Sequence, residues 1–301
     1  MRKFFSALLL CFFSVYGDVA DSIIPQLNQL KHEAGNGPAL RIMTYNMLYN
    51  VANAERKLPE KHRWPQRMYR LAEYLQFSCP DLIGSQELQE RQIQDLMALI
   101  GNVYACYGEK TREKEGRTDT NAIFYNPYRL QLVEGITVPF GNQTGGNAFT
   151  YCTFYDRYAH RTMSVVNFKL TYGLTWEPIK KRKLEAVQLA QFVNRLPQDH
   201  LIIVLGDFNI IPFLDGEAIP QILAKAFLQD SRNLTSLVFG PACSSTNSIF
   251  LTPFTGPEIT GLIPDRIFVK NNGRVLSCGI DPGRVDGEFP SDHLPVIIDM
   301  E

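Results

Sequence analysis

The segment LIIVLGDFN, residues 201–209, carries the clearest structural signal in this 301-residue chain. Five consecutive apolar residues are typical of a central strand that is buried on both faces. Gly206, Asp207 and Asn209 follow directly, and such residues usually form a turn. Because the sites of α/β proteins lie beyond strand ends, Asp207 and Asn209 are also candidates for a functional site.

Polar residues also stand at the ends of four further strand-like segments. They are Asn46 after RIMTY (41–45), Glu87 after LIGSQ (82–86), Asp265 at the start of DRIFV (265–269), and Asp292 and His293 before LPVII (294–298). Any one of them alone would more often be a turn residue, a helix start or a surface group. Five strand ends that each supply a carboxylate, an amide or an imidazole favour one shared site at one edge of a sheet.

The remaining periodicities predict a mixture of hairpins and strand–helix units. Strand-like runs occupy residues 40–47, 121–126, 130–138, 149–156 and 162–170, and helical spacing occupies residues 67–77, 89–100 and 177–196. Such a mixture predicts mixed sheets with helices outside them. No Pro/Gly/Ser-rich linker of useful length interrupts residues 40–301, so we expect one domain there.

The N-terminus is typical of an export signal. Arg2 and Lys3 precede the apolar run FFSALLLCFFSV, residues 4–15, which is too short to span a membrane. We expect a signal peptide over residues 1–17 and an N-terminal leader over residues 18–39. The protein would then be exported across the inner membrane and would be periplasmic or secreted.

Composition and charge exclude several classes of protein. The chain is 45% hydrophobic and 20% charged, which excludes a disordered chain, and its net charge of −1 argues against a strongly basic protein that wraps nucleic acid. None of the six cysteines shows CxxC spacing, so a structural zinc site is not expected. One or two disulfides and several buried free thiols are both compatible with the sequence.

Five short motifs together resemble the endonuclease/exonuclease/phosphatase superfamily of deoxyribonuclease-like, metal-dependent phosphoesterases. They are TYN (44–46), IGSQE (83–87), GDFN (206–209), DRIF (265–268) and SDHLPV (291–296). GDFN with a terminal SDHLPV is the specific pair among them. The resemblance implies one domain over residues 40–301. It also implies an α/β fold of four layers, in which two mixed β-sheets pack face to face and helices cover the outer faces.

The resemblance also implies a metal site and a catalytic water. Magnesium or manganese would be bound by Glu87, Asn46 and Asp292, because oxygen ligands suit these hard cations better than zinc. Asp207 would orient or deprotonate the attacking water. Asn209 would help to hold water or phosphate.

His293 and Asp265 would act as a pair. By the resemblance, His293 contacts the scissile phosphate and Asp265 accepts a hydrogen bond from its other ring nitrogen. A carboxylate in that position fixes the tautomer of the ring and raises its pKa. The pair therefore predicts a cationic phosphate contact rather than a free base.

Lys169 departs from the family pattern. Many members carry a second histidine in a segment reading NTHL, whereas VNFKL, residues 166–170, places Lys169 there. An ammonium group neutralises phosphate charge, but at its ordinary pKa of about 10.4 it gives up protons poorly. His160, earlier on the same strand, is a candidate substitute, yet its odd spacing would place it on the opposite face.

Asn121 and Arg182 are weaker candidates for substrate contacts. Asn121 ends RTDTN, residues 117–121, where family members often present polar contacts, and Asp119 in the same segment is weaker still. Arg182 lies near the position at which several members place an arginine that faces the site. The run KKRK, residues 180–183, is also typical of a solvated helix start.

The function that we expect is that of an exported, magnesium-dependent phosphoesterase that hydrolyses phosphodiester bonds by activated water, in the manner of a nuclease. One alternative is a phospholipid or inositol-phosphate hydrolase of the phosphatase or phospholipase C type, for which the aromatic-rich residues 250–254 would be suitable. Another is a catalytically silent binding member of the fold. The expected partner is a phosphoester, from nucleic acid or a phospholipid headgroup, and we expect a monomer without a membrane span.

Overall fold

The computed structural model describes residues 39–50, 56–108, 113–114, 117–141, 147–240, 243–247, 253–255, 263–271 and 273–301. The chain divides into two compact units at residues 38 and 39, and the second unit contains every described residue. The predicted signal peptide, nearly all of the predicted leader and most of the aromatic-rich segment 250–254 lie outside the described residues. Among the described helices, none is long and apolar enough to cross a membrane.

The first sheet has seven strands in the order β13-β17-β18-β1-β2-β7-β4. The strands are β1 (Leu40–Asn46), β2 (Leu82–Gln86), β4 (Ala105–Tyr107), β7 (Ile123–Tyr125), β13 (Val238–Phe239), β17 (Val275–Ile280) and β18 (Val296–Met300). β1 runs parallel to β2 and antiparallel to β18. The sheet is therefore mixed, as predicted.

The second sheet has six strands in the order β12-β16-β11-β10-β9-β8. The strands are β8 (Leu130–Pro139), β9 (Ala148–Asp156), β10 (Arg161–Lys169), β11 (Leu201–Asp207), β12 (Gln229–Asp230) and β16 (Asp265–Lys270). β10 and β11 are parallel and the other pairs are antiparallel. The apolar run at residues 201–205 is fully buried near the middle of this sheet, which confirms its prediction as a central strand.

Among the described residues, five further short strands form two small sheets. β3 (Leu88–Gln89), β6 (Arg117–Thr120) and β5 (Glu113–Lys114) form one small sheet, and β14 (Cys243–Asn247) pairs with β15 (Pro253–Thr255). Two short 3-10 helices, η1 (Glu60–His62) and η3 (Ser231–Asn233), are also described. Cys79, Cys106, Cys152 and Cys278 are free thiols, and the last two are buried.

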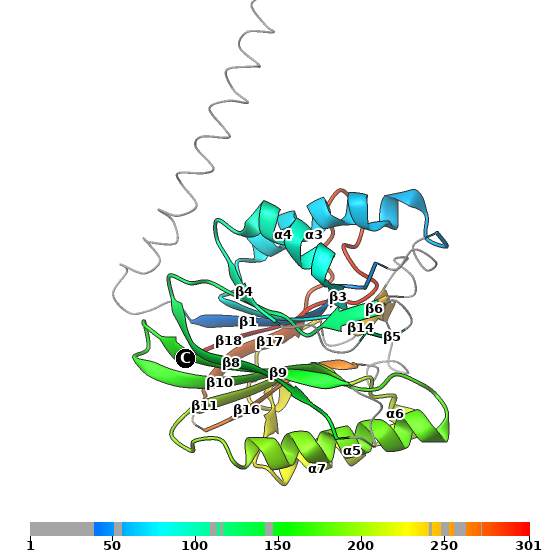
Figure 1. Ribbon diagram of the computed structural model, residues 1–301. Helices are drawn as coiled ribbons and strands as arrows, with labels where there is room; N and C mark the ends of the chain where they lie inside the picture. Colours follow the sequence, from blue (N-terminus) through cyan, green and yellow to red (C-terminus); the bar gives the residue numbers. More distant parts are fainter. Residues whose placement is uncertain are drawn as a thin grey trace, which may run out of the picture. The chain divides into compact units, whose positions relative to one another are not determined.

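Helices cover the outer faces of both sheets (Figure 1). α3 (Trp64–Ser78) and α4 (Glu90–Ile100) lie over the seven-stranded sheet, whereas α5 (Trp176–Val193), α6 (Pro212–Asp215) and α7 (Ala218–Ala224) lie on the side of the six-stranded sheet. α4 begins with a capping box between Gln89 and Gln92, and α3 ends at Cys79, which adopts the left-handed conformation. The four-layer arrangement that the resemblance implied is confirmed.

The apolar core is divided between two interfaces. Ile42 of β1, Leu82 of β2 and Ile203 of β11 belong to the cluster between the two sheets. Val204 of β11 and Leu189 of α5 belong to the cluster between the six-stranded sheet and its helices. Adjacent residues of β11 therefore point to different cores, because side chains alternate across a strand. This alternation determines which polar residues at the strand ends face the other sheet.

Candidate active site

The inner faces of both sheets change from apolar to polar at the same strand ends. In β11, Ile203 and Leu205 contribute to the core between the sheets, and Asp207 is the next residue on that face. In β1, Ile42 belongs to the same core and Asn46 lies four residues further along the same face. The polar residues thus gather between the sheets, where the apolar core ends.

Three polar residues lie side by side across the six-stranded sheet. Lys169, the last residue of β10, pairs in register with Asp207 at the end of β11. Asp207 in turn pairs with Asp265 at the start of the antiparallel strand β16. Register alone therefore places Lys169 beside Asp207, with Asp265 on the other side of Asp207, and both carboxylates are completely buried.

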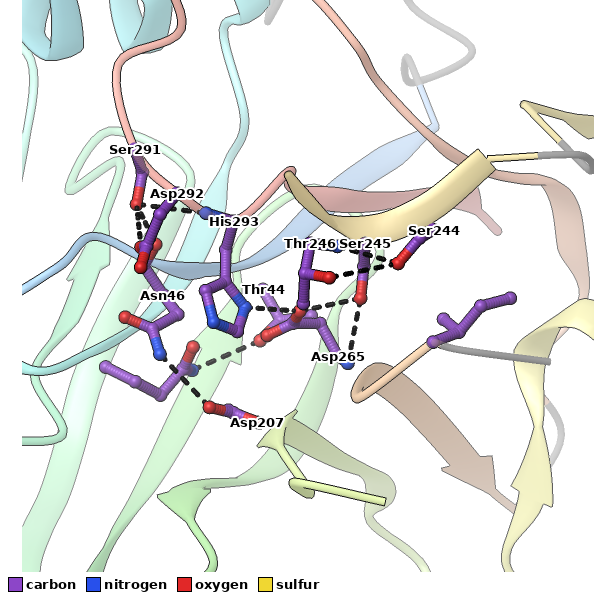
Figure 2. A network of polar contacts seen from close by, with 12 residues as sticks. Thr44, Asn46, Asp207, Ser244, Ser245, Thr246, Asp265, Ser291, Asp292 and His293 are labelled. Carbon is purple, nitrogen blue, oxygen red and sulfur yellow. Dashed lines mark hydrogen bonds and ion pairs between the residues drawn. The ribbon is translucent and has the colours of Figure 1, made fainter. Parts of the chain in front are cut away.

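A histidine and a serine bind Asp265 from outside the sheet (Figure 2). His293 Nδ1 lies 2.8 Å from Asp265 Oδ2, and Ser245 Oγ donates a hydrogen bond of 2.7 Å to the same oxygen. The backbone N–H of Asp265 donates to Ser245 Oγ, and the N–H of Leu294 donates to Ser245 O. These contacts fix β14, β16 and the loop before β18 around one imidazole ring.

The surroundings of the Asp265–His293 pair favour its ionised form. Burial raises the pKa of Asp265 to about 6, and the opposing attraction of His293 keeps the rise to that size. Burial by itself would lower the pKa of His293, but the neighbouring carboxylates, Asp265 foremost, raise it to about 10. The raised pKa favours an imidazolium, which suits a negatively charged phosphate.

Asn46 connects the two sheets at this position. Its Nδ2 donates to Glu87 Oε1 over 3.3 Å and to Asp207 Oδ2 over 3.0 Å. Its Oδ1 accepts the backbone N–H of Leu48 over 3.1 Å. Asn46 therefore positions two carboxylates that come from different sheets.

Glu87 adopts a left-handed backbone conformation, with φ of 69°, directly after β2. This conformation is unfavourable for a residue with a side chain, and such residues concentrate at functional sites. The Tyr49 backbone N–H donates to Glu87 Oε2 over 3.2 Å, and the ammonium group of Lys169 pairs with Oε1. Lys169 Nζ also lies 4.0 Å from Asp207 Oδ2.

The contacts of Asn209 are with the protein backbone and Asp207, whereas the resemblance implied that it helps to hold water or phosphate. Its backbone N–H donates to Asp207 Oδ1 over 2.8 Å, and its side-chain Nδ2 donates to the carbonyl of Leu170 over 2.8 Å. Asn209 also has a left-handed backbone, with φ of 48°. Its observed contacts therefore fix the turn after β11 and aim the Asp207 carboxylate.

The carboxylates of Glu87 and Asp292 fit a hard divalent cation, and Asn46 would join them through Oδ1 once its amide turns, because it directs Nδ2 at Glu87. Ser291 Oγ joins the two parts of this set, because it donates to the Asn46 carbonyl over 2.7 Å and lies 3.4 Å from Asp292 Oδ1. Burial raises the pKa of Asp292, so this carboxylate gains from a cation placed near it. Carboxylate and amide oxygens are the ligands that Mg²⁺ and Mn²⁺ prefer.

A second possible cation position is formed by Asp207, Asp265 and His293, whose ligand atoms lie within 4.8 Å of one another. In this group Asp265 and His293 bind each other, and the protonated ring repels a cation. Asp265 Oδ1 is buried and has no hydrogen-bond partner among the described residues, so it can accept a bond from a water molecule. Asp265 and His293 are thereby better suited to water and phosphate, and Asn46, Glu87 and Asp292 stay the predicted metal ligands.

Of the remaining candidates, Asn121 is buried and His160 is exposed. Asn121 is buried and donates from Nδ2 to the Ala148 carbonyl over 2.8 Å. His160 is exposed in the turn before β10, at the opposite end of that strand from Lys169, so it does not replace the family histidine. The side chain of Asp119 is outside the described residues.

The structure contradicts both predictions made for Arg182, a phosphate contact and a solvated helix start. It is completely buried, and its guanidinium forms two hydrogen bonds with Asp215, of 2.9 and 2.7 Å, and one of 2.7 Å with the Gly173 carbonyl. These bonds join α5 to α6 and to the loop after β10. A guanidinium that is enclosed in this way offers no surface to a substrate.

Sequence reasoning did not identify the bridge that aligns the two sheets beneath the site. Gln86 Nε2 donates to Asn167 Oδ1 over 2.7 Å, and Asn167 Nδ2 donates to the Ser85 carbonyl over 2.9 Å. Asn167 and Lys169 share one face of β10, and Gln86 precedes Glu87. The sequence feature that could have indicated this bridge is the position of Asn167, a polar residue two places before Lys169 and therefore on the same face of the strand. Ser245 was missed as well, since nothing in CSST marks it.

Comparisons with known proteins agree with this geometry. The model of the Endonuclease/Exonuclease/phosphatase family matches residues 43–293. No curated protein matches the sequence.

Solved structures share the fold at low sequence identity. A mannosyl-6-phosphatase from Bacteroides thetaiotaomicron is 19% identical, with a TM-score of 0.72 over 87% of this chain and 100% of that one. The catalytic domain of human Nocturnin is 19% identical, with a TM-score of 0.67 over 88% and 93%. TDP2 from D. rerio in complex with a single-strand DNA product is 17% identical, with a TM-score of 0.64 over 87% and 98%. At these identities the likeness demonstrates the fold alone.

Proposed function

Since the chain belongs to the endonuclease/exonuclease/phosphatase family and is a phosphoester hydrolase of that family, we propose that it hydrolyses phosphodiester bonds with a magnesium or manganese ion and an activated water. The observation that carries the proposal is the position of an ionised Asp265–His293 pair beside the buried carboxylate of Asp207. Anion binding and water activation are thereby available at one place. Phosphoryl transfer needs both.

In the proposed mechanism, Asp207 orients and deprotonates the attacking water. Its Oδ1 accepts from the Asn209 backbone and its Oδ2 from Asn46, so the carboxylate is held in one orientation. The His293 imidazolium binds a phosphoryl oxygen through Nε2, because Nδ1 is directed at Asp265. Its positive charge stabilises the charge that develops on that oxygen in the transition state.

Asn46, Glu87 and Asp292 would hold the metal ion, which when bound supplies Lewis-acid neutralisation of phosphoryl charge. The contribution of the chain is to hold these oxygens in place before substrate arrives. The backbone N–H of Tyr49 holds Glu87, and Ser291 holds the Asn46 backbone. Lys169 supplies a further positive charge next to Glu87.

The test is hydrolysis of bis-p-nitrophenyl phosphate and of p-nitrophenyl phosphate, each with and without EDTA. We expect faster hydrolysis of the diester, loss of activity with EDTA and recovery on addition of Mg²⁺. In Glu87→Gln the Mg²⁺ needed for half-maximal activity should rise at least about 10–100-fold, the cost of losing even an outer partner of a metal ligand. Glu73→Gln, on the exposed face of α3, is the matched control. Unchanged Mg²⁺ dependence in Glu87→Gln would contradict the assignment.

A phospholipid or inositol-phosphate hydrolase is the second candidate, and one surface feature favours it. Tyr172, Leu174 and Trp176 follow β10 directly and are 67%, 58% and 69% exposed. Neighbouring exposed apolar residues of this size are typical of a surface that contacts a lipid or a protein. The same assay with phospholipid vesicles and with single-stranded DNA separates this candidate from the nuclease-like function.

We also propose that the protein is exported, on the basis of the charged start and short apolar run of residues 1–17. Expression of the complete chain followed by N-terminal sequencing of the extracytoplasmic product tests this directly. A product that begins at residue 18 is expected. Retention of the full chain inside the cell would contradict the proposal.

A further inference from the structure

Lys169 introduces a positive charge into the group of carboxylates that is assigned to the metal. Its Nζ pairs with Glu87 Oε1 and lies 4.0 Å from Asp207 Oδ2. The side chain of Lys169 is 20% exposed, whereas those of Glu87 and Asp207 are 8% and 0% exposed. The ion pair is therefore shielded from water, and it is stronger than a pair on an open surface.

The ammonium group and a metal ion would use the same oxygen atoms. Glu87 Oε1 already accepts from Lys169 and from Asn46 Nδ2, and Oε2 accepts from the Tyr49 backbone. A divalent cation that approaches Glu87 must displace Lys169 Nζ or bind within a few ångströms of it. Like charges at that separation repel strongly in a partly buried site.

The pairing of β10 with β11 determines where Lys169 lies. It is the last residue of β10, its register with Asp207 is set by the parallel pairing with β11, and Asn167 on the same face is anchored to Gln86. The strand pairing therefore places the backbone of Lys169 beside Asp207, and from there the ammonium group reaches Glu87.

We propose that Lys169 is a built-in counter-cation that competes with the divalent metal ion for Glu87. The metal site is consequently neutralised and ordered without metal, and it binds metal more weakly than the same oxygens would alone. This inference rests on the metal-dependent function proposed above, because it uses the same Glu87.

The experiment measures Mn²⁺ binding without substrate, by electron paramagnetic resonance of unbound Mn²⁺, in the wild-type chain and in Lys169→Met. Methionine keeps much of the length of the side chain and removes its charge. We expect Lys169→Met to bind Mn²⁺ at least about tenfold more tightly, since a unit charge close to the ion is removed. Lys169→Arg keeps the charge and should stay within about threefold of wild type.

Lys270→Met is the matched control. Lys270 is also largely buried but stands at the opposite end of β16 from Asp265, over the ring of Phe227. Its substitution should leave the Mn²⁺ affinity unchanged. A tighter site in Lys270→Met would attribute the effect to net charge and would overturn the inference.

A second measurement guards against loss of the fold. Without metal, Lys169→Met should unfold at a lower temperature than wild type, because its carboxylates are no longer neutralised, and Mn²⁺ should raise its Tm by more than it raises that of wild type. Equal or weaker Mn²⁺ binding in Lys169→Met, with equal Tm shifts, overturns the inference. So does the absence of Mn²⁺ binding from both chains.

The Mn²⁺-binding experiment tests this inference separately from the proposed function, because it measures no hydrolysis. If the affinities follow the expected order and no phosphoester is cleaved, the inference stands and the proposed function fails. If Mg²⁺-dependent cleavage is found and the affinities are equal, the inference fails and the proposed function stands.

Discussion

At the scale of single residues, His293 depends on one partner for its charge. Asp265 Oδ2 binds the ring over 2.8 Å and is the largest influence that raises its pKa. Ser245 holds Asp265 from the other side. A change at either member of the pair therefore alters the same interaction with substrate.

Asp265→Asn should lower kcat by about 10²–10⁴-fold, which is the usual contribution of a positioned acid–base group. The Tm should change little, because the shape of the side chain is retained. His293→Gln should have a similar effect. The double variant should be slower than the worse single variant by less than about tenfold, because coupled residues act as a unit. Rates with bis-p-nitrophenyl phosphate at saturating Mg²⁺ provide the measurement. Fully additive losses would show that the two residues act separately.

The grouping of the candidate site residues was predictable because they stand at or near strand ends, and strand ends are visible in hydrophobic patterns. Their hydrogen bonds were less predictable. Ser245 lies on a short strand in a polar stretch, and its role depends on a tertiary contact with Asp265 that no local pattern encodes.

At the scale of elements, Arg182 determines how α5 is attached to the rest of the unit. Ile179, Arg182, Ala186 and Leu189 follow the spacing of one helix face, and all four are buried. That spacing is present in the sequence and could have identified Arg182 as an inward-facing residue. The neighbouring lysines concealed it, because a run of charges ordinarily indicates a solvated face.

Arg182→Met should destabilise the protein by about 3–5 kcal/mol, because it leaves the buried carboxylate of Asp215 without its partner. The double variant Arg182→Met/Asp215→Leu should recover a large part of this loss, since no unpaired charge then remains. Urea unfolding gives both values. Lys183→Met, on a partly exposed position of the same helix, should change the free energy of unfolding by less than about 0.5 kcal/mol.

Glu185 of the same helix makes stability depend on pH. Burial raises its pKa, although Thr171 and Asn147 donate hydrogen bonds to it. A carboxyl group whose pKa is higher in the folded state than in the unfolded state stabilises the fold at low pH. That contribution is lost as the pH rises through the folded value.

Glu185→Gln should remove this dependence. The free energy of unfolding of the variant, relative to wild type, should therefore increase as the pH rises from about 4 through the raised pKa. Urea unfolding of both chains at a series of pH values measures the slope. A constant difference between the two chains across the series would contradict the shift.

At the scale of the whole unit, the two sheets are in close contact at Gly84. A Cβ atom there would lie 1.8 Å from Leu205 Cδ1 and 2.8 Å from Asn167 Oδ1. The first contact crosses the core between the sheets and the second reaches the bridge beneath the site. Sequence patterns predicted both sheets and their helices, but they did not predict this contact, because patterns describe faces rather than the distance between them.

Gly84→Ala should destabilise the protein by about 1–3 kcal/mol, as overpacking of a core does, and should lower kcat through displacement of Asn167. Thermal unfolding and the diester assay measure the two effects. Gly141→Ala is the control, because the three nearest atoms that its Cβ would meet among the described residues belong to Gln188, at 3.6 Å or more. A Gly84→Ala chain as stable and active as wild type would show that the sheets separate easily.

The row formed by Lys169, Asp207 and Asp265 has a consequence for biosynthesis. β10 and β11 are parallel and are joined through α5, so their pairing closes a long loop and belongs to the slower steps of folding. A slip of one residue would turn Lys169 to the helix side of the sheet and would place Phe168 among the carboxylates. Molecules trapped in such a register would not hydrolyse phosphoesters. A newly made chain therefore becomes active only after its central strands have paired in the correct register.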